Sequence, residues 1–186
     1  HGTRSRAGVG IAVKHSFLAQ FNEPTADDWE ETEPGRAGTL RLRGPQGCLD
    51  ITATYFAIGC PTQLHPAAQS LSSGGNDAAQ DAAIRRQRHD MRCKLHHAMT
   101  PQTHSLSIVL GDFNWVAEES DRVNTTTANP SASRDKDEKH WISGAAAQGF
   151  HEIHQPLPTH DSAIARSRLD RIYWDQHTAE QLDRSP

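Results

Sequence analysis

An α/β fold is the expectation for this chain of 186 residues, because short strand-like segments alternate with one long helical segment. Three features carry that expectation. Alternating apolar segments flank a turn at 44–47, a long segment with a helical apolar stripe spans 77–99, and an apolar run at 105–110 ends in Gly-Asp-Phe-Asn. The length is suited to a single domain, 1–186, with its own core.

The N-terminal segments predict strands joined by turns. Residues 8–14 alternate small and apolar side chains, which is typical of a strand. Residues 22–37 contain two prolines and several acids and are expected to be a loop. Alternation in 38–43 and in 48–58, on either side of the turn at 44–47, predicts a β-hairpin.

The middle of the chain predicts a loop, a helix and a buried strand. Residues 59–76 are rich in Pro, Ser and Gly and are expected to form a long loop. Asn76 is a candidate N-cap for a helix over 77–99, whose apolar stripe at helical spacing consists of Ile84, Met91, Leu95 and Ala98. The run 105–110 then predicts a strand buried in the sheet.

Smaller elements are expected in the last third of the chain. Residues 120–136, rich in Ser, Thr and Asn, predict a second long loop. A short helix containing Trp141 is expected to end near Gly149, and a strand is expected at 150–154. A proline-containing link leads to a final strand within 167–174.

Composition limits the classes of protein to be considered. The formal net charge of −4 is not that of a typical nucleic-acid binder, although a metal-dependent enzyme also gathers carboxylates. No apolar run approaches the length of a membrane span, so no membrane partner is expected. Cys48, Cys60 and Cys93 lack any Cys-x-x-Cys spacing, which favours a reducing, intracellular compartment. The twelve histidines lack zinc-protease spacing and are interpreted as facing solvent.

The junction Gly111-Asp112-Phe113-Asn114 is the most informative part of the sequence. The period of a strand predicts Asp112 and Asn114 on one side and Phe113 in the core. A carboxylate beside a carboxamide at a strand end suits a metal ion and a phosphate oxygen. The alternative is an ordinary Asp/Asn turn leaving a strand.

A second motif, Ser167-Arg-Leu-Asp-Arg-Ile172, places the Asp170 carboxylate among strand-like residues. A strand ending in Gly-Asp-Phe-Asn, followed later by this motif, resembles the endonuclease/exonuclease/phosphatase superfamily. Its members include abasic-site nucleases, LINE-type retrotransposon endonucleases and inositol-phosphate phosphatases. The resemblance spans about 8–174 and implies a four-layer sandwich of two mixed β-sheets flanked by helices, incomplete at both termini. The strand and helix pattern alone predicts only the α/β class.

The resemblance also implies phosphodiester hydrolysis that depends on Mg²⁺ or Mn²⁺. Asp112 would orient or deprotonate the attacking water, and Asn114 would donate to a phosphate oxygen. Asp112 and Asp170 are candidate metal ligands, and Asp170 alternatively partners a catalytic histidine. Tyr55 matches the tyrosine that family members place against the scissile phosphate. The structural alternative for Asp170 is a carboxylate bonded to backbone at a strand end. The structural alternative for Tyr55 is a tyrosine in the core.

Three further residues are candidates for substrate binding. Ser167 and Thr159 match family positions near the site, and Arg168 belongs to a local basic patch that could track phosphates. The alternatives are local hydrogen bonds for the two hydroxyls and a solvated surface charge for the arginine.

Two local features favour the nuclease branch of the family. Asp121-Arg122 follows the first motif, as in some retrotransposon endonucleases, and Arg166-Ser-Arg-Leu169 stands where inositol phosphatases have Pro-Ala-(Trp/Cys). We therefore expect a DNA endonuclease of retroelement type. DNA is its expected partner, a reverse transcriptase domain is expected in the same polyprotein, and a nuclear location follows by analogy. A phosphatase of the same fold acting on a small phosphorylated substrate, and a non-catalytic degenerate remnant, stay open.

The resemblance also implies segments that this sequence does not contain. Family members have an upstream strand with a metal-binding glutamate and a downstream Ser-Asp-His segment. Loss of a general acid or base lowers rates by about 10²–10⁴-fold. We therefore expect these 186 residues alone to be weak or inactive.

Overall fold

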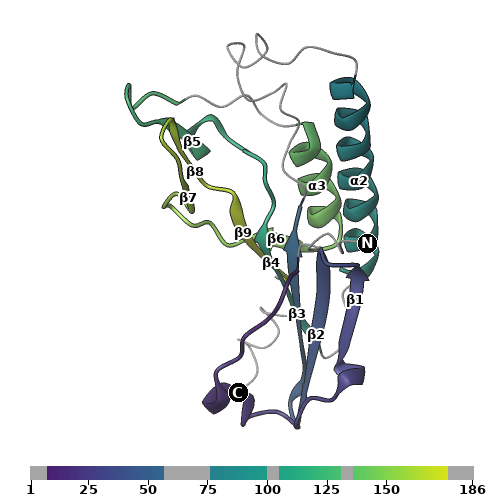
Figure 1. The fold of residues 1–186 in the computed structure, drawn as a ribbon. Helices are drawn as coiled ribbons and strands as arrows, with labels where there is room; N and C mark the ends of the chain where they lie inside the picture. Colours follow the sequence, from purple (N-terminus) through teal and green to yellow (C-terminus); the bar gives the residue numbers. More distant parts are fainter. Residues whose placement is uncertain (1–7, 57–75, 100–104, 131–135, 176–186) are drawn as a thin grey trace, which may run out of the picture.

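The computed structural model describes residues 8–56, 76–99, 105–130 and 136–175, which form two β-sheets with helices beside them (Figure 1). The larger sheet has six strands in the order β1-β2-β3-β4-β9-β6. Their bounds are Trp29–Glu33 (β1), Ala37–Gly44 (β2), Gly47–Tyr55 (β3), Ser105–Asp112 (β4), Asp170–Asp175 (β9) and Phe150–Glu152 (β6). Strands β3 and β4 pair parallel and the other pairs are antiparallel, so this sheet is mixed. The predicted α/β class is confirmed.

Strands β2 and β3 form the predicted hairpin. They pair antiparallel along their whole length, and the turn lies at Pro45-Gln46. The hydroxyls of Thr39 and Thr52 lie 2.8 Å apart across the pair. Arg41 donates two hydrogen bonds of 2.7 Å to the carboxylate of Asp50. Such cross-strand pairs stabilise a sheet and define its register.

Strand β1 lies in the segment 22–37, which the sequence predicted to be a loop, so that prediction is wrong for this part. A short 3₁₀ helix, Ala26–Asp28, precedes the strand. The strand sequence Trp-Glu-Glu-Thr-Glu is acidic and lacks an apolar alternation. The indole ring of Trp29 in β1 packs closely on Gly38 of β2. A Cβ at Gly38 would lie 2.2 Å from this ring. Pairing with β2 and this packing override a weak strand propensity.

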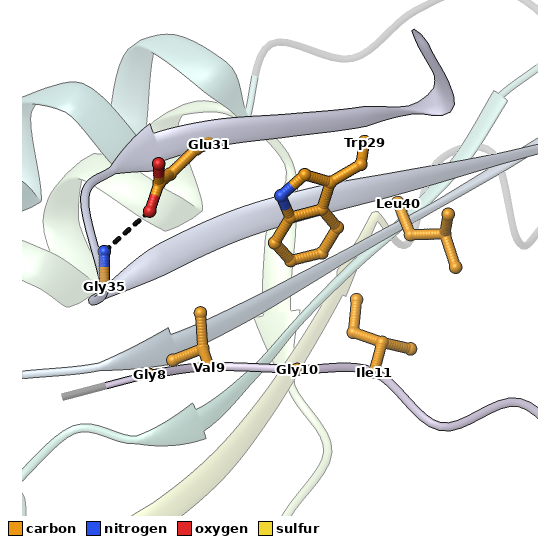
Figure 2. A pocket seen from close by; sticks show the side chains of 8 residues that line it. All are labelled: Gly8, Val9, Gly10, Ile11, Trp29, Glu31, Gly35 and Leu40. Atoms are coloured by element: carbon orange, nitrogen blue, oxygen red, sulfur yellow. Dashed lines mark hydrogen bonds between the residues drawn. The ribbon is translucent and has the colours of Figure 1, made fainter. Parts of the chain in front are cut away.

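Residues 8–14, predicted to be a strand, form none, because within the described chain they have no ladder partner. A short helix, α1 (His15–Leu18), follows them. Val9 and Ile11 instead face Trp29 and Leu40 across a cavity of about 450 Å³ (Figure 2).

Helix α2 (Asn76–Ala98) lies between β3 and β4 in the chain, as expected for a connection between parallel strands. It confirms the helix predicted over 77–99. Together with α3 (Lys136–Ala147), which confirms the helix predicted around Trp141, it lies against one face of the larger sheet (Figure 1). The predicted loop 59–76 lies outside the described residues except for Asn76, the first residue of α2.

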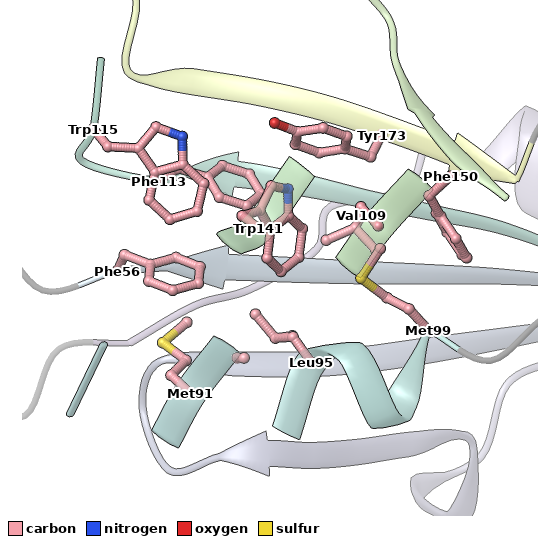
Figure 3. Close-up of a cluster of buried hydrophobic side chains, with 12 residues drawn as sticks. Phe56, Met91, Leu95, Met99, Val109, Phe113, Trp115, Trp141, Phe150 and Tyr173 are labelled. Carbon is pink, nitrogen blue, oxygen red and sulfur yellow. The ribbon is translucent and has the colours of Figure 1, made fainter. Parts of the chain in front are cut away.

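Aromatic rings dominate the core between these helices and the sheet (Figure 3). Ring centroids among Phe56, Phe113, Trp115, Trp141 and Tyr173 lie 4.9–6.1 Å apart in tilted, edge and stacked pairs. Aromatic pairs at such distances add to the stabilisation from burial alone. Phe113 is fully buried here, as the strand period predicted.

The smaller sheet consists of β5 (Arg122–Asn124), β8 (Ala165–Ser167) and β7 (His160–Asp161), all antiparallel, in the order β5-β8-β7. Strand β5 forms inside the segment 120–136, which was predicted to be a loop. Its three residues are too short a segment to predict a strand, and pairing with β8 forms it. Residues 131–135 of that segment lie outside the described residues. Since β8 runs almost directly into β9, the second motif passes from one sheet to the other.

None of the described helices has the length and apolar character needed to cross a membrane. Cys48 is partly exposed, Cys93 is exposed, and both are free thiols. Cys60 lies outside the described residues.

Candidate active site

Three candidate side chains lie in a row at the ends of neighbouring strands. Tyr55 on β3 is in register with Asp112 on β4, and Asp112 is in register with Asp170 on β9. Directly opposite residues on paired strands present their side chains to the same face. The helices pack on the other face, to which Val109 and Tyr173 point. All three site residues are half-buried.

Gly111, immediately before this row, has a backbone conformation in which a side chain would run into β3. Its φ is +146°, and a Cβ at this position would lie 1.9 Å from the carbonyl oxygen of Thr54 on β3. Only glycine fits here, because any side chain would meet backbone rather than a side chain that could move.

The residues after Asp112 form a turn rather than a continued strand. Asn114 has φ +51°, in the left-handed region that asparagine tolerates. Its backbone N–H donates to Asp112 Oδ1 at 2.8 Å, and its side-chain Nδ2 donates to the carbonyl of Phe56 at 2.8 Å. Asn114 is therefore held beside Asp112 by the Asp/Asn turn that the sequence left as an alternative, and not by the strand period.

The surroundings of Asp112 disfavour its charge. Burial raises the pKa of this carboxyl, and the neighbouring charge of Asp170 raises it further. The hydrogen bond from the Asn114 N–H and the nearby charge of His160 act against that rise without cancelling it. A proton or a cation would therefore be favoured next to Asp112.

His160 is a neighbour of the candidate site that the sequence interpretation missed. It lies on β7 in register with Ser167, is exposed, and is close enough to influence the Asp112 carboxylate. His160 also lines a cavity of about 290 Å³, together with Leu157, Pro158, Thr159, Asp161 and Arg166. The only signal in the sequence was the position of His160 directly after the candidate Thr159.

The two candidate hydroxyls form local hydrogen bonds. Thr159 Oγ1 accepts from the backbone N–H groups of Leu169 and Asp170 at 3.1 and 3.0 Å, and so supports the backbone that carries Asp170. Ser167 is buried, and its Oγ accepts a hydrogen bond of 3.0 Å from Arg122. These contacts correspond to the local alternative considered for both residues.

Arg168 points into the protein rather than toward a substrate. Its guanidinium donates to Asp121 at 2.8 Å and also pairs with Glu152, and its side chain is 6% exposed. The interpretation of Arg168 as a phosphate-tracking surface charge therefore does not agree with its position. Spacing in the sequence could not reveal this, because both acids come from other elements.

Asp112 and Asp170 are the residues best placed to hold a cation. Among the described residues, no three or more His, Cys, Asp or Glu side chains converge on a common metal position. Two carboxylates are an all-oxygen donor set of the kind that Mg²⁺ or Mn²⁺ accepts while keeping several waters. The residues present thus fit such an ion with few protein ligands.

Comparison with known proteins gives one family and several similar solved structures. The family described as Endonuclease/Exonuclease/phosphatase matches residues 1–184. No curated protein sequence matches the chain. One similar solved structure is the endonuclease domain of TRAS1, a telomere-specific non-LTR retrotransposon, with 13% identity and a TM-score of 0.49 over 84% of this chain and 59% of that one. A second is an AP endonuclease from Archaeoglobus fulgidus, with 16% identity and a TM-score of 0.48 over 80% of this chain and 55% of that one. A third is a 3′-5′ exonuclease from Neisseria meningitidis, with 14% identity and a TM-score of 0.48 over 86% of this chain and 59% of that one. The chain spans less than two thirds of the length of each of these structures.

Proposed function

Since this chain belongs to the endonuclease/exonuclease/phosphatase family, we propose that it carries the Asp112, Asn114 and Asp170 of a Mg²⁺-dependent DNA endonuclease of retroelement type. The observation that supports this most is the in-register pair of Asp112 and Asp170. Two half-buried like charges directly opposite each other destabilise a sheet. Arrangements of that kind usually serve a ligand or a reaction.

Each residue has a role that follows from its surroundings. Asp112, whose pKa is raised by burial, would be a stronger base than an exposed carboxylate and is suited to accept a proton from the attacking water. Asn114 donates one N–H of its amide to Phe56, and its side chain also interacts with the Asp112 carboxylate, so a phosphate oxygen would compete with Asp112 for this amide. Tyr55 would offer its hydroxyl from the β3 end of the row. A Mg²⁺ ion at Asp112 and Asp170 would supply charge to stabilise the phosphoryl oxygens.

The choice of DNA rests on the sequence motifs and on the charges near the row. Asp121-Arg122 follows the first motif in the order found in some retrotransposon endonucleases. His160, whose charge acts on Asp112, would attract a phosphate backbone, whereas Arg166 in the same cavity is paired with Asp161 at 3.3 Å. A reverse transcriptase domain in the same polyprotein and a nuclear location follow from the retroelement type and belong to this proposal.

The test is nicking of supercoiled plasmid by the protein that carries this chain. We expect nicking with Mg²⁺ or Mn²⁺ and loss of nicking with EDTA. The nicking rate of Asp112→Asn should be lower by at least about 100-fold. Asp90→Asn, a matched change of an exposed acid on α2, should leave nicking unchanged.

Parallel assays of phosphate release from inositol phosphates separate the alternatives. Phosphate release without nicking would replace the proposal by a phosphatase of the same fold. If the unchanged protein shows neither activity and Asp112→Asn alters nothing, the chain is a non-catalytic remnant.

A further inference from the structure

Four charged side chains form a buried group next to Asp170: Asp121, Glu152, Arg168 and Arg171, here called the four-charge cluster. Asp121 accepts hydrogen bonds of 2.8 Å from Arg168 Nε and from Arg171 Nη2. Arg171 Nη1 donates to both oxygens of Glu152 at 2.9 and 3.1 Å, and Arg168 Nη1 pairs with the same carboxylate. The exposed fractions of the side chains are 3% for Asp121, 21% for Glu152, 6% for Arg168 and 0% for Arg171.

The four-charge cluster is balanced, with two acids facing two arginines. Burial alone would raise the pKa of Asp121, but the hydrogen bonds from Arg171, Glu118 and Arg168 hold it below its usual value. A buried charge that loses its partner is strongly unfavourable. Each member therefore depends on the others, and we expect the loss of Asp121, the more deeply buried of the two acids, to disturb the cluster most.

Asp121 also fixes the segment that follows Asn114. Its Oδ2 accepts the backbone N–H groups of Ala117 and Glu118, each at 2.9 Å. The backbone carbonyl of Asp121 accepts the N–H of Arg168 at 2.8 Å. The first motif and its following turn are thus tied to the second motif through one aspartate.

The arginines of the four-charge cluster flank Asp170 in the second motif. Between them, the carbonyl of Leu169 accepts the N–H of Phe113 at 3.0 Å. The cluster and this hydrogen bond together clamp the chain that carries Asn114 against the chain that carries Asp170.

We propose that the four-charge cluster is a positioning device for the site, with Asp121 as its central positioning residue. It holds Asn114 and Asp112 in a set relation to Asp170 without touching substrate or metal, because its side chains point inward. Reaction rates depend steeply on such placement, since a shift of about 1 Å costs about 100-fold. This inference rests on the proposed function for its catalytic part, whereas the clamp itself is independent of any activity.

The first test is Asp121→Asn, which keeps the shape and removes the charge. We expect kcat for plasmid nicking to fall about 10–100-fold with KM nearly unchanged. Amide hydrogen exchange at Phe113 and Arg168 should speed up at least about 10-fold more than at Val109 inside β4. Glu33→Gln, which breaks the exposed pair with Lys94, is the matched control and should change neither quantity.

A double variant separates positioning from stability. Asp121→Asn combined with Arg168→Gln restores the charge balance, so its Tm should recover relative to the single variant. Its kcat should stay low, because the side-chain link between Arg168 and Asp121 is still missing. Recovery of kcat together with Tm would reduce the four-charge cluster to a merely structural role and overturn the proposal.

Glu152→Gln covers the case in which Asp121→Asn does not fold. Glu152 is more exposed, and its loss leaves Asp121 bound to both arginines, so we expect a smaller fall in kcat, about 3–10-fold. Unchanged exchange at Phe113 in every folded cluster variant would overturn the clamp, whatever the activity. If the unchanged protein shows no nicking, the proposed function is overturned. In that case only the catalytic part of this inference falls with it, and the clamp is still tested by hydrogen exchange.

Discussion

Asp112 on β4 and Asp170 on β9 stand directly opposite each other as an in-register antiparallel pair. Neither residue has a cation opposite it in this ladder, and the burial of Asp112 raises the pKa of its carboxyl. Such a pair lowers the stability of the sheet. We interpret this pair of acids as a site that binds a ligand, and the loss of stability as a consequence of keeping both acids there.

Asp112→Asn should therefore stabilise the fold. Because the folded-state pKa of Asp112 lies above its unfolded value, the ionised carboxylate is destabilising at neutral pH. We expect an increase of about 0.5–1 kcal/mol in the free energy of unfolding at pH 7, or about 1–4 °C in Tm. Thermal unfolding as a function of pH checks this. The gain should shrink as the pH falls through the folded-state pKa and should vanish below about 3.8. A destabilised Asp112→Asn variant at pH 7 would contradict the interpretation.

Gly111→Ala should be strongly destabilising. A Cβ at Gly111 would lie 1.9 Å from the Thr54 carbonyl, and the φ of +146° is strained for any other residue. We expect a loss of about 3 kcal/mol or more, measured by urea unfolding. Gly10→Ala is the control, because a Cβ there meets no atom within 4 Å. Equal stabilities of the two variants would show that Gly111 does not lie against the Thr54 carbonyl as described.

His96 should make stability depend on pH in the mildly acidic range. Its ring stacks on Trp141 with centroids 4.9 Å apart, and burial, with a smaller effect from Arg92, lowers its pKa below 6.5. Since the unfolded chain then binds the proton more readily, stability falls as the pH drops from about 6.5 through the folded-state pKa.

The measurement for His96 is the free energy of unfolding at pH 7 and pH 5. We expect the unchanged protein to lose about 0.5–1 kcal/mol more than His96→Phe between these values. His140→Phe, a matched change at an exposed position of α3, should retain the full dependence. The same slope in His96→Phe would assign the pH dependence to another group.

Tyr55→Phe should affect activity far more than stability. The ring stays over the Arg36 guanidinium, which lies 4.8 Å from its centroid, so packing is kept. Loss of the hydroxyl should lower kcat for plasmid nicking about 10–100-fold if it contacts the scissile phosphate. Nicking and urea unfolding of the same preparation check both parts. Unchanged kcat would favour the structural alternative, in which Tyr55 is a core tyrosine without a role in the reaction.

Local patterns predicted the elements that have strong local signals. The hairpin β2–β3, helix α2 and strand β4 were all predicted, because their apolar periods match the geometry of each element. Strand β1 was missed and residues 8–14 were wrongly predicted to be a strand. In both cases the outcome depends on whether a partner strand is present, and a single segment carries no information about that.

The sequence by itself determined which side chains form the candidate site, since Asp112, Asn114 and Asp170 stand in two recognisable motifs. Only the tertiary structure decided how they meet: Asp112 and Asp170 by register, and Asn114 by a turn. It also directed Arg168 inward to Asp121 and Glu152, where the sequence suggested a surface charge. The physical reason is that a side chain's chemistry is local, whereas its burial and its charged partners come from elements far away in the chain.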